Sequence, residues 1–121
     1  MANKKTLLIG ASEDPSRYSN MAIRSLRKHG HDVAAIGNRP GTVADVDFGK
    51  DKLPLQDIDT VTLYINPTRQ PDYYDYILSL HPKRIIFNPG TENPELEQMA
   101  EAKGIKAMEA CTLVLLSTGQ F

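Results

Sequence analysis

Short apolar segments recur along this chain and alternate with helix-like sequence, and this alternation restricts the possible folds more than any other feature. The segments are Thr6–Ala11, Asp32–Gly37, Thr60–Ile65, Arg84–Asn88 and Ile105–Glu109. Most of them are almost continuously apolar, which is typical of strands buried on both faces. Strand–helix–strand repeats pair in parallel through right-handed crossovers. The sequence therefore predicts an α/β fold with a doubly wound, five-stranded parallel sheet, and we expect the strand order 3-2-1-4-5.

Three predicted helices connect these strands. The helix near residues 18–28 has apolar residues on one face and a glycine stop at Gly30. A second helix is expected over Arg69–Leu80, and a third begins with Asn93 as its N-cap and ends at Gly104.

The connection from residue 38 to residue 59 differs from the others because it is rich in turn-forming and charged residues. Such composition does not favour a full helix. We expect a short hairpin there, followed by one turn of helix at Leu55–Ile58.

Size and charge restrict the domain count and the kinds of partner. The chain has 121 residues, so we expect a single domain over residues 1–121. Its net charge of -1 provides no global field for binding nucleic acid or a membrane, and any anion must be bound locally.

Cys111 is the only cysteine, which excludes an internal disulfide and indicates a reducing compartment. With no apolar run of membrane-spanning length and no signal-like N-terminus, we expect a complete cytoplasmic protein.

A ligand of such a sheet binds beyond the carboxyl ends of the strands, at the reversal of strand order, which the predicted order places between the first and fourth strands. The loop after the first strand, Gly10–Asn20, leads into a helix start whose amides and dipole favour phosphate. The dinucleotide motif GxGxxG is absent, since Gly10 is the only glycine before Lys28. Alternatively, Gly10 only permits a tight strand exit and Arg17 is a solvated surface charge.

The second strand exits through Asn38, Arg39 and Pro40, where an NAD-binding protein would carry an acidic residue for the ribose hydroxyls. Arg39 is suited instead to a charge-assisted pair with a ribose phosphate. These two loops favour NADP or coenzyme A over NAD. The alternative for Asn38 and Pro40 is ordinary turn chemistry.

The third and fourth strands both exit through Asn-Pro turns. A proline turn directs the backbone without offering a donor, so these loops can pass close to a flat ring or a pantetheine-like chain. As structure alone, they are turns with capping residues. The candidate residues are Asn66, Pro67 and Thr68 in the first turn and Asn88, Pro89, Gly90 and Thr91 in the second.

Catalytic residues are not evident in the sequence. Cys111 has no nearby His or Lys in sequence to lower its pKa, and the pattern is more typical of a small buried apolar residue. The histidines fall at the opposite edge of the predicted sheet. Glu13, Asp14 and Glu92 fall at the binding edge, but nothing in the sequence pairs them with a nucleophile, a metal ligand or a base.

Taken together, the motifs GASEDPSRYSN, KHGHDV, GNRPG, NPTR, NPGTEN and MEAC resemble those of the single-domain CoA-binding proteins, relatives of the N-terminal CoA-binding domain of the succinyl-CoA synthetase alpha subunit. The resemblance covers the chain from the first strand to Cys111 and implies a Rossmann-like fold. It implies that Gly10, Ala11, Ser12, Arg17 and Tyr18 lie over the ligand's phosphates and that Asn38, Arg39 and Pro40 lie near its adenosine. It further implies that Asn66, Pro67 and Thr68 flank the adenine or pantetheine path, and that Asn88, Pro89, Gly90 and Thr91 form the remaining edge.

The resemblance does not imply catalysis, because the chain lacks the phosphohistidine loop and the grasp-type partner that the synthetase needs. We expect non-catalytic binding of coenzyme A or an acyl-CoA, in the role of a sensor, a carrier or an enzyme partner. The alternative is a small NADP-dependent reductase. The absence of a three-glycine loop and of a Tyr-Lys proton-donating pair favours binding over hydride transfer.

Overall fold

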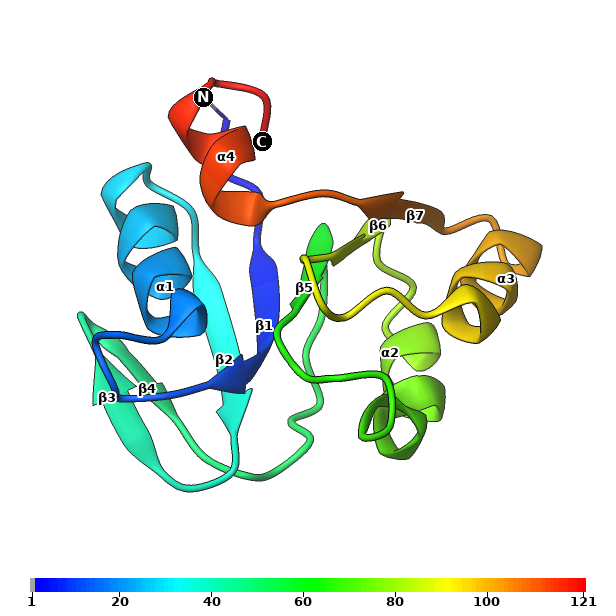
Figure 1. Cartoon of the computed structure of the whole chain (residues 1–121), viewed down its shortest axis with the longest axis horizontal. Coiled ribbons are helices and arrows are strands. Elements are labelled where there is room, and N and C mark those ends of the chain that lie inside the picture. The colour runs from blue at the N-terminus through cyan, green and yellow to red at the C-terminus, as the bar shows by residue number, and fades with distance from the viewer. Residues whose placement is uncertain (1) are drawn as a thin grey trace.

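The apolar segments form the predicted parallel sheet in the computed structural model, which describes residues 2–121 (Figure 1). All neighbouring strands in the sheet are parallel, and the order is β2-β1-β5-β6-β7. The strands are β1 (Thr6–Ala11), β2 (Val33–Gly37), β5 (Thr60–Leu63), β6 (Arg84–Phe87) and β7 (Lys106–Glu109). The predicted fold class, a doubly wound, Rossmann-like α/β sheet of five parallel strands, is confirmed.

The strand order follows the Rossmann-like pattern, but the segments at two positions differ from our assignment. We expected Thr60–Ile65 outside the second strand and Arg84–Asn88 beside the first, whereas β5 lies beside β1 and β6 lies beside β5. The position outside β2 belongs to the hairpin of β3 (Gly41–Val43) and β4 (Val46–Phe48), after which Gly49 forms one parallel bridge to Ile36. This hairpin covers the outer edge of β2, so β5 pairs with the free side of β1 instead. The reversal of strand order therefore lies between β1 and β5. We had placed it between β1 and the fourth predicted strand, which is β6.

The helices confirm most of the predicted ends. They are α1 (Tyr18–Lys28), the 3-10 helix η1 (Gln70–Tyr73), α2 (Tyr74–Ser79), α3 (Pro94–Ala102) and α4 (Thr112–Ser117). The Asn93 side chain caps α3 by accepting from the Leu96 amide at 3.3 Å. Two predictions differ. The second helix begins as a 3-10 turn. Leu55–Ile58 forms no helix: Asp57 has a positive φ of 59°, which interrupts a helix, and the Ile58 side chain lies in the core. The short helix α4 was not predicted.

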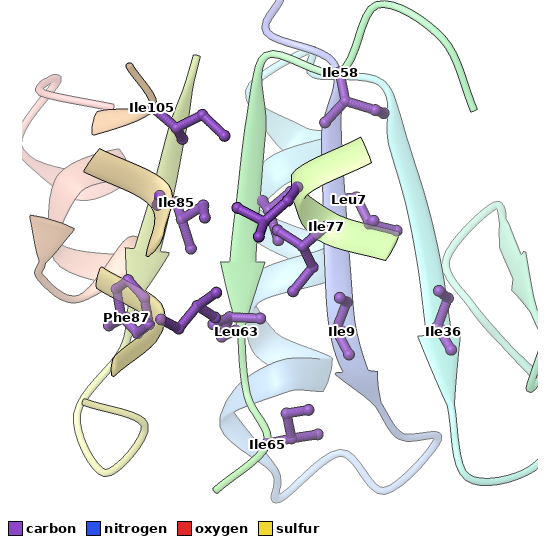
Figure 2. Close-up of a cluster of buried hydrophobic side chains, with 14 residues drawn as sticks. Leu7, Ile9, Ile36, Ile58, Leu63, Ile65, Ile77, Ile85, Phe87 and Ile105 are labelled. Carbon is purple, nitrogen blue, oxygen red and sulfur yellow. The ribbon is translucent and has the colours of Figure 1, made fainter. Parts of the chain in front are cut away.

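Alternate residues of each strand face opposite layers of helices. Leu7 and Ile9 point to the side covered by α2 and α3, where they join Ile77, Phe87 and other buried side chains in one cluster (Figure 2). Leu8 points to the other side, which α1 and α4 cover. Both faces of the sheet are therefore buried, which explains the continuously apolar strands. Within residues 2–121 no helix combines the length and the apolar character needed to cross a membrane.

Candidate functional site

A cleft of about 670 Å³ opens at the carboxyl ends of β1, β2, β5 and β6. Its position beyond the point where the strand order reverses is the expected place for a ligand in such a sheet. Most of the predicted site residues meet there. Those that line the cleft are Gly10, Ala11, Ser12, Arg17, Tyr18, Asn38, Arg39, Asn66, Pro89, Gly90 and Thr91.

Four of the predicted residues, Pro40, Pro67, Thr68 and Asn88, do not line the cleft. Asn88 is 2% exposed and lies inside the protein. Its Nδ2 donates to Thr62 Oγ1 at 2.7 Å, and its Oδ1 accepts from the Thr112 amide at 2.9 Å. Asn88 therefore joins the end of β6 to β5 and to the start of α4, which is a structural role.

The loop from β1 to α1 requires glycine at its first position. Gly10 has φ +108°, and a Cβ there would lie 2.8 Å from the backbone carbonyl carbon and oxygen of Tyr64. A hydrogen bond inside the loop region then joins its start to α1, because Asn20 Nδ2 donates to the Ser12 carbonyl at 3.0 Å. The strand ends can approach each other closely only because Gly10 has no side chain.

Tyr18 and Ser19, in the first turn of α1, line the cleft. The N-cap of α1, Arg17, makes no side-chain capping hydrogen bond, and the first turn carries no acidic residue. Uncapped amides and the positive end of the helix dipole form a favourable environment for a phosphate.

Two carboxylates at the cleft are already bonded to protein donors. Glu13 Oε2 accepts from the Thr42 amide at 3.0 Å, which attaches the β1–α1 loop to the hairpin. Asp14 Oδ1 accepts from the Ser16 amide at 2.9 Å and from the Ser16 hydroxyl at 2.7 Å. These bonds from Ser16 lower the pKa of the Asp14 carboxyl, with a smaller contribution from Arg17. Both side chains help to shape the loop.

Three arginines, Arg17, Arg39 and Arg69, line the cleft. Arg69 was not among the predicted site residues. It follows Asn66-Pro67-Thr68, and its guanidinium reaches across to donate to Asn38 Oδ1 at the end of β2. The NPTR motif identified the loop, but only the tertiary structure shows that the arginine side chain spans two strand ends.

A buried amide network supports the two walls of the cleft that come from β5 and β6. Gln70 is fully buried, and its Nε2 donates to the carbonyls of Ile65 at 3.0 Å and of Thr91 at 2.8 Å. Its Oε1 accepts from Asn93 Nδ2 at 2.8 Å. Buried polar groups of this kind are costly unless each one is paired. Gln70 therefore holds the two loops in one relative position.

Tyr64 is a second lining residue that the sequence analysis missed. Its backbone amide donates to Ile9 at 2.8 Å, and its ring packs against the buried residues beneath α1. Burial raises the pKa of the Tyr64 hydroxyl well above its usual value, although the neighbouring Thr112 hydroxyl opposes the shift. The hydroxyl stays protonated at neutral pH and is a poor proton donor in catalysis.

Among residues 2–121 no three His, Cys, Asp or Glu side chains are placed to hold a metal ion. Cys111 is half-buried at the N-cap of α4 and does not line the cleft.

The doubly wound sheet, the uncapped helix start and the arginine-lined cleft are features of a nucleotide-binding Rossmann-like domain. Within that class, residues 4–117 match the family model of the CoA binding domain, and the chain belongs to this family. The resemblance inferred from the sequence motifs is confirmed.

Solved structures with the same fold include close and distant relatives. A crystal structure of an uncharacterised protein is 47% identical to this chain, with a TM-score of 0.96 and 100% of both chains covered. A hypothetical protein from Pyrococcus horikoshii OT3 is 25% identical, with a TM-score of 0.85, and the match covers 96% of this chain and 83% of the other.

A larger enzyme contains a similar fold. The dinucleotide-forming acetyl-coenzyme A synthetase 1 of Ca. Korarchaeum cryptofilum, in complex with phosphate and ADP, is 20% identical, with a TM-score of 0.67. The match covers 88% of this chain but only 26% of the synthetase, and it shows the fold alone. No match was found among the curated proteins.

Proposed function

We propose that this protein is a single-domain binder of coenzyme A or an acyl-CoA and that it carries out no chemistry on the ligand. The observation that carries the proposal is the cleft of this CoA binding domain, which combines the uncapped start of α1 with Arg17, Arg39 and Arg69. Coenzyme A carries a pyrophosphate and a ribose phosphate. Helix amides and guanidinium groups are the partners that such phosphates favour in proteins.

The polar groups around the cleft support binding without catalysis. The hydrogen bonds from Ser16 lower the pKa of Asp14, which makes its carboxylate a weaker base, and Glu13 is used to attach the loop to the Thr42 amide. Tyr64 has a raised pKa, which does not suit a proton donor for hydride transfer. These features favour a sensor, a carrier or a partner of an enzyme over a small NADP-dependent reductase.

Thermal unfolding in the presence of candidate ligands tests the proposal. We expect coenzyme A and acetyl-CoA to raise the melting temperature and NADP to leave it unchanged. A ligand at a hundred times its Kd stabilises the folded state by about 2.7 kcal/mol, which is readily measured. Native mass spectrometry of freshly purified protein would show which acyl group, if any, is retained.

Two results would contradict the proposal. Stabilisation by NADP alone would support the reductase. Unchanged melting with every nucleotide, together with no retained ligand in native mass spectrometry, would leave only a role through a protein partner.

A further inference from the structure

We propose that Arg69 and Arg39 together form the element that selects a ligand with a phosphate monoester on its ribose. The proposal rests on the proposed function, because it assigns a part of the same cleft to a part of the ligand. Arg39 was expected there from its place after β2. The structure adds Arg69, which comes from a different loop.

Arg69 is held in place at both ends. Its backbone amide donates to the Asn66 carbonyl at 3.1 Å and to Asn66 Oδ1 at 3.2 Å, which fixes the start of η1. Its guanidinium donates to Asn38 Oδ1 at the end of β2. The charged group of Arg69 therefore lies beside the residue that directly precedes Arg39.

Both guanidinium groups retain donors for a ligand. Arg39 is exposed and lines the cleft, and it makes no hydrogen bond or ion pair within residues 2–121. Arg69 uses one Nη on Asn38, and a guanidinium has five N–H donors. Within residues 2–121 neither Arg39 nor Arg69 forms an ion pair with a carboxylate, and Asp14 pairs with Arg17 instead at 4.0 Å.

The chemistry of this pair favours a dianionic phosphate over neutral hydroxyls. Guanidinium groups bind phosphate oxygens through paired, charge-assisted hydrogen bonds, and two such groups can bind one phosphate from two sides. Ribose hydroxyls are bound in similar folds by a carboxylate after the second strand. Asn38, Arg39 and Arg69 provide no carboxylate at this position.

Calorimetry on the full chain can separate the ribose phosphate from the rest of the ligand. Coenzyme A and dephospho-CoA differ only in this phosphate, and adenosine 3′,5′-bisphosphate and adenosine 2′,5′-bisphosphate report on its position. The variants are R69Q, R39Q and the double variant, with R69K as a second substitution at residue 69. Lys28→Gln is the matched control, since Lys28 is an exposed cation in the last turn of α1, away from the cleft.

We expect wild-type protein to bind coenzyme A more tightly than dephospho-CoA and the 3′,5′-bisphosphate more tightly than the 2′,5′-bisphosphate. R69Q should weaken coenzyme A binding about 10-fold and dephospho-CoA binding less than about 2-fold, because the charge-assisted bond is lost only for the phosphorylated ligand. R69K should fall between R69Q and wild type, since it keeps the charge but not the paired geometry. Lys28→Gln should bind all ligands as wild type does.

The outcomes distinguish this inference from the proposed function. If wild type binds coenzyme A and R69Q weakens both coenzyme A forms equally, the function stands and the inference is wrong. If wild type prefers the 2′,5′-bisphosphate, the pair selects the phosphate of NADP and the coenzyme A assignment is wrong. If wild type binds neither coenzyme A form nor either bisphosphate, both proposals are wrong. Circular dichroism melting confirms that each variant is folded before its affinity is compared.

Discussion

Replacing Gly10 by alanine should be among the most damaging single-methyl substitutions in this protein. Two separate costs arise at this position. The backbone has φ +108°, a conformation that residues with a Cβ rarely adopt, and the new Cβ would lie 2.8 Å from the carbonyl carbon and oxygen of Tyr64. Both contacted atoms belong to the backbone at the end of β5, so neither can rotate away.

The expected loss is the sum of these two costs. Alanine at a positive φ costs about 1 kcal/mol or more. Forcing a methyl group against fixed atoms costs about 1 to 3 kcal/mol. Gly10→Ala should therefore lower the free energy of unfolding by about 2 to 4 kcal/mol, equivalent to a fall in Tm of about 6 to 20 °C for a domain of this size.

Gly90 supplies the matched control. It has φ +90°, but no heavy atom other than those of Gly90 and its two chain neighbours lies within 4 Å of the position that its Cβ would occupy. Gly90→Ala should therefore show only the backbone cost, about 1 kcal/mol. Since Gly90 lines the cleft, the coenzyme A affinity of the Gly90→Ala variant should be measured alongside its stability.

Urea denaturation followed by circular dichroism measures both variants. The reasoning fails if Gly10→Ala is no less stable than Gly90→Ala, because the close approach of β1 and β5 would then contribute nothing. An apo Gly90→Ala protein of wild-type stability would show that the positive φ is not costly there.

Three further predictions concern the buried polar groups. Asn88→Ala should lower the free energy of unfolding by about 2 to 4 kcal/mol in urea denaturation, because the Thr112 amide loses its acceptor, while coenzyme A affinity measured by calorimetry changes less than about 2-fold. Gln70→Leu should cost about 2 to 4 kcal/mol in the same assay, since the Ile65 carbonyl and its other partners become unpaired, and it should also weaken coenzyme A binding because the two cleft walls separate. Burial, with His29 and Lys4 adding to it, lowers the pKa of His31 below its usual 6.5, so the unfolded chain takes up a proton first and the urea midpoint should fall as pH drops below about 6.5.

Each of these predictions has an outcome that would contradict it. A large loss of coenzyme A affinity in Asn88→Ala at unchanged stability would return Asn88 to the ligand site. Unchanged affinity in a destabilised Gln70→Leu would show that the network supports the fold only. For His31, the control is His31→Gln, and an equally steep pH dependence in that variant would assign the effect to another group.

Local sequence determined the elements of this fold. The strands from Thr6, Thr60 and Arg84 could be predicted because parallel strands buried on both faces must be apolar throughout. The start of α3 could be predicted because the Asn93 cap acts on the amide of a residue close in sequence. The edge that carries the cleft also followed from the sequence, since all parallel strands present their carboxyl ends on one side.

Tertiary structure decided which strand lies beside β1 and which side chains reach the cleft. The hairpin segment covers the outer edge of β2 and is joined to it by the bridge between Ile36 and Gly49. The periodicity of apolar residues along the chain does not predict which segments pair in this way. The Asn88 side chain points into the protein and bonds to the start of α4, whereas the Arg69 side chain crosses the cleft to Asn38. The local sequences are similar, because Asn88 belongs to one Asn-Pro turn after a strand and Arg69 closely follows another. Sequence predicts where a strand ends because the determinants are local, whereas the direction of a side chain at that end depends on the donors and acceptors that distant segments bring to it.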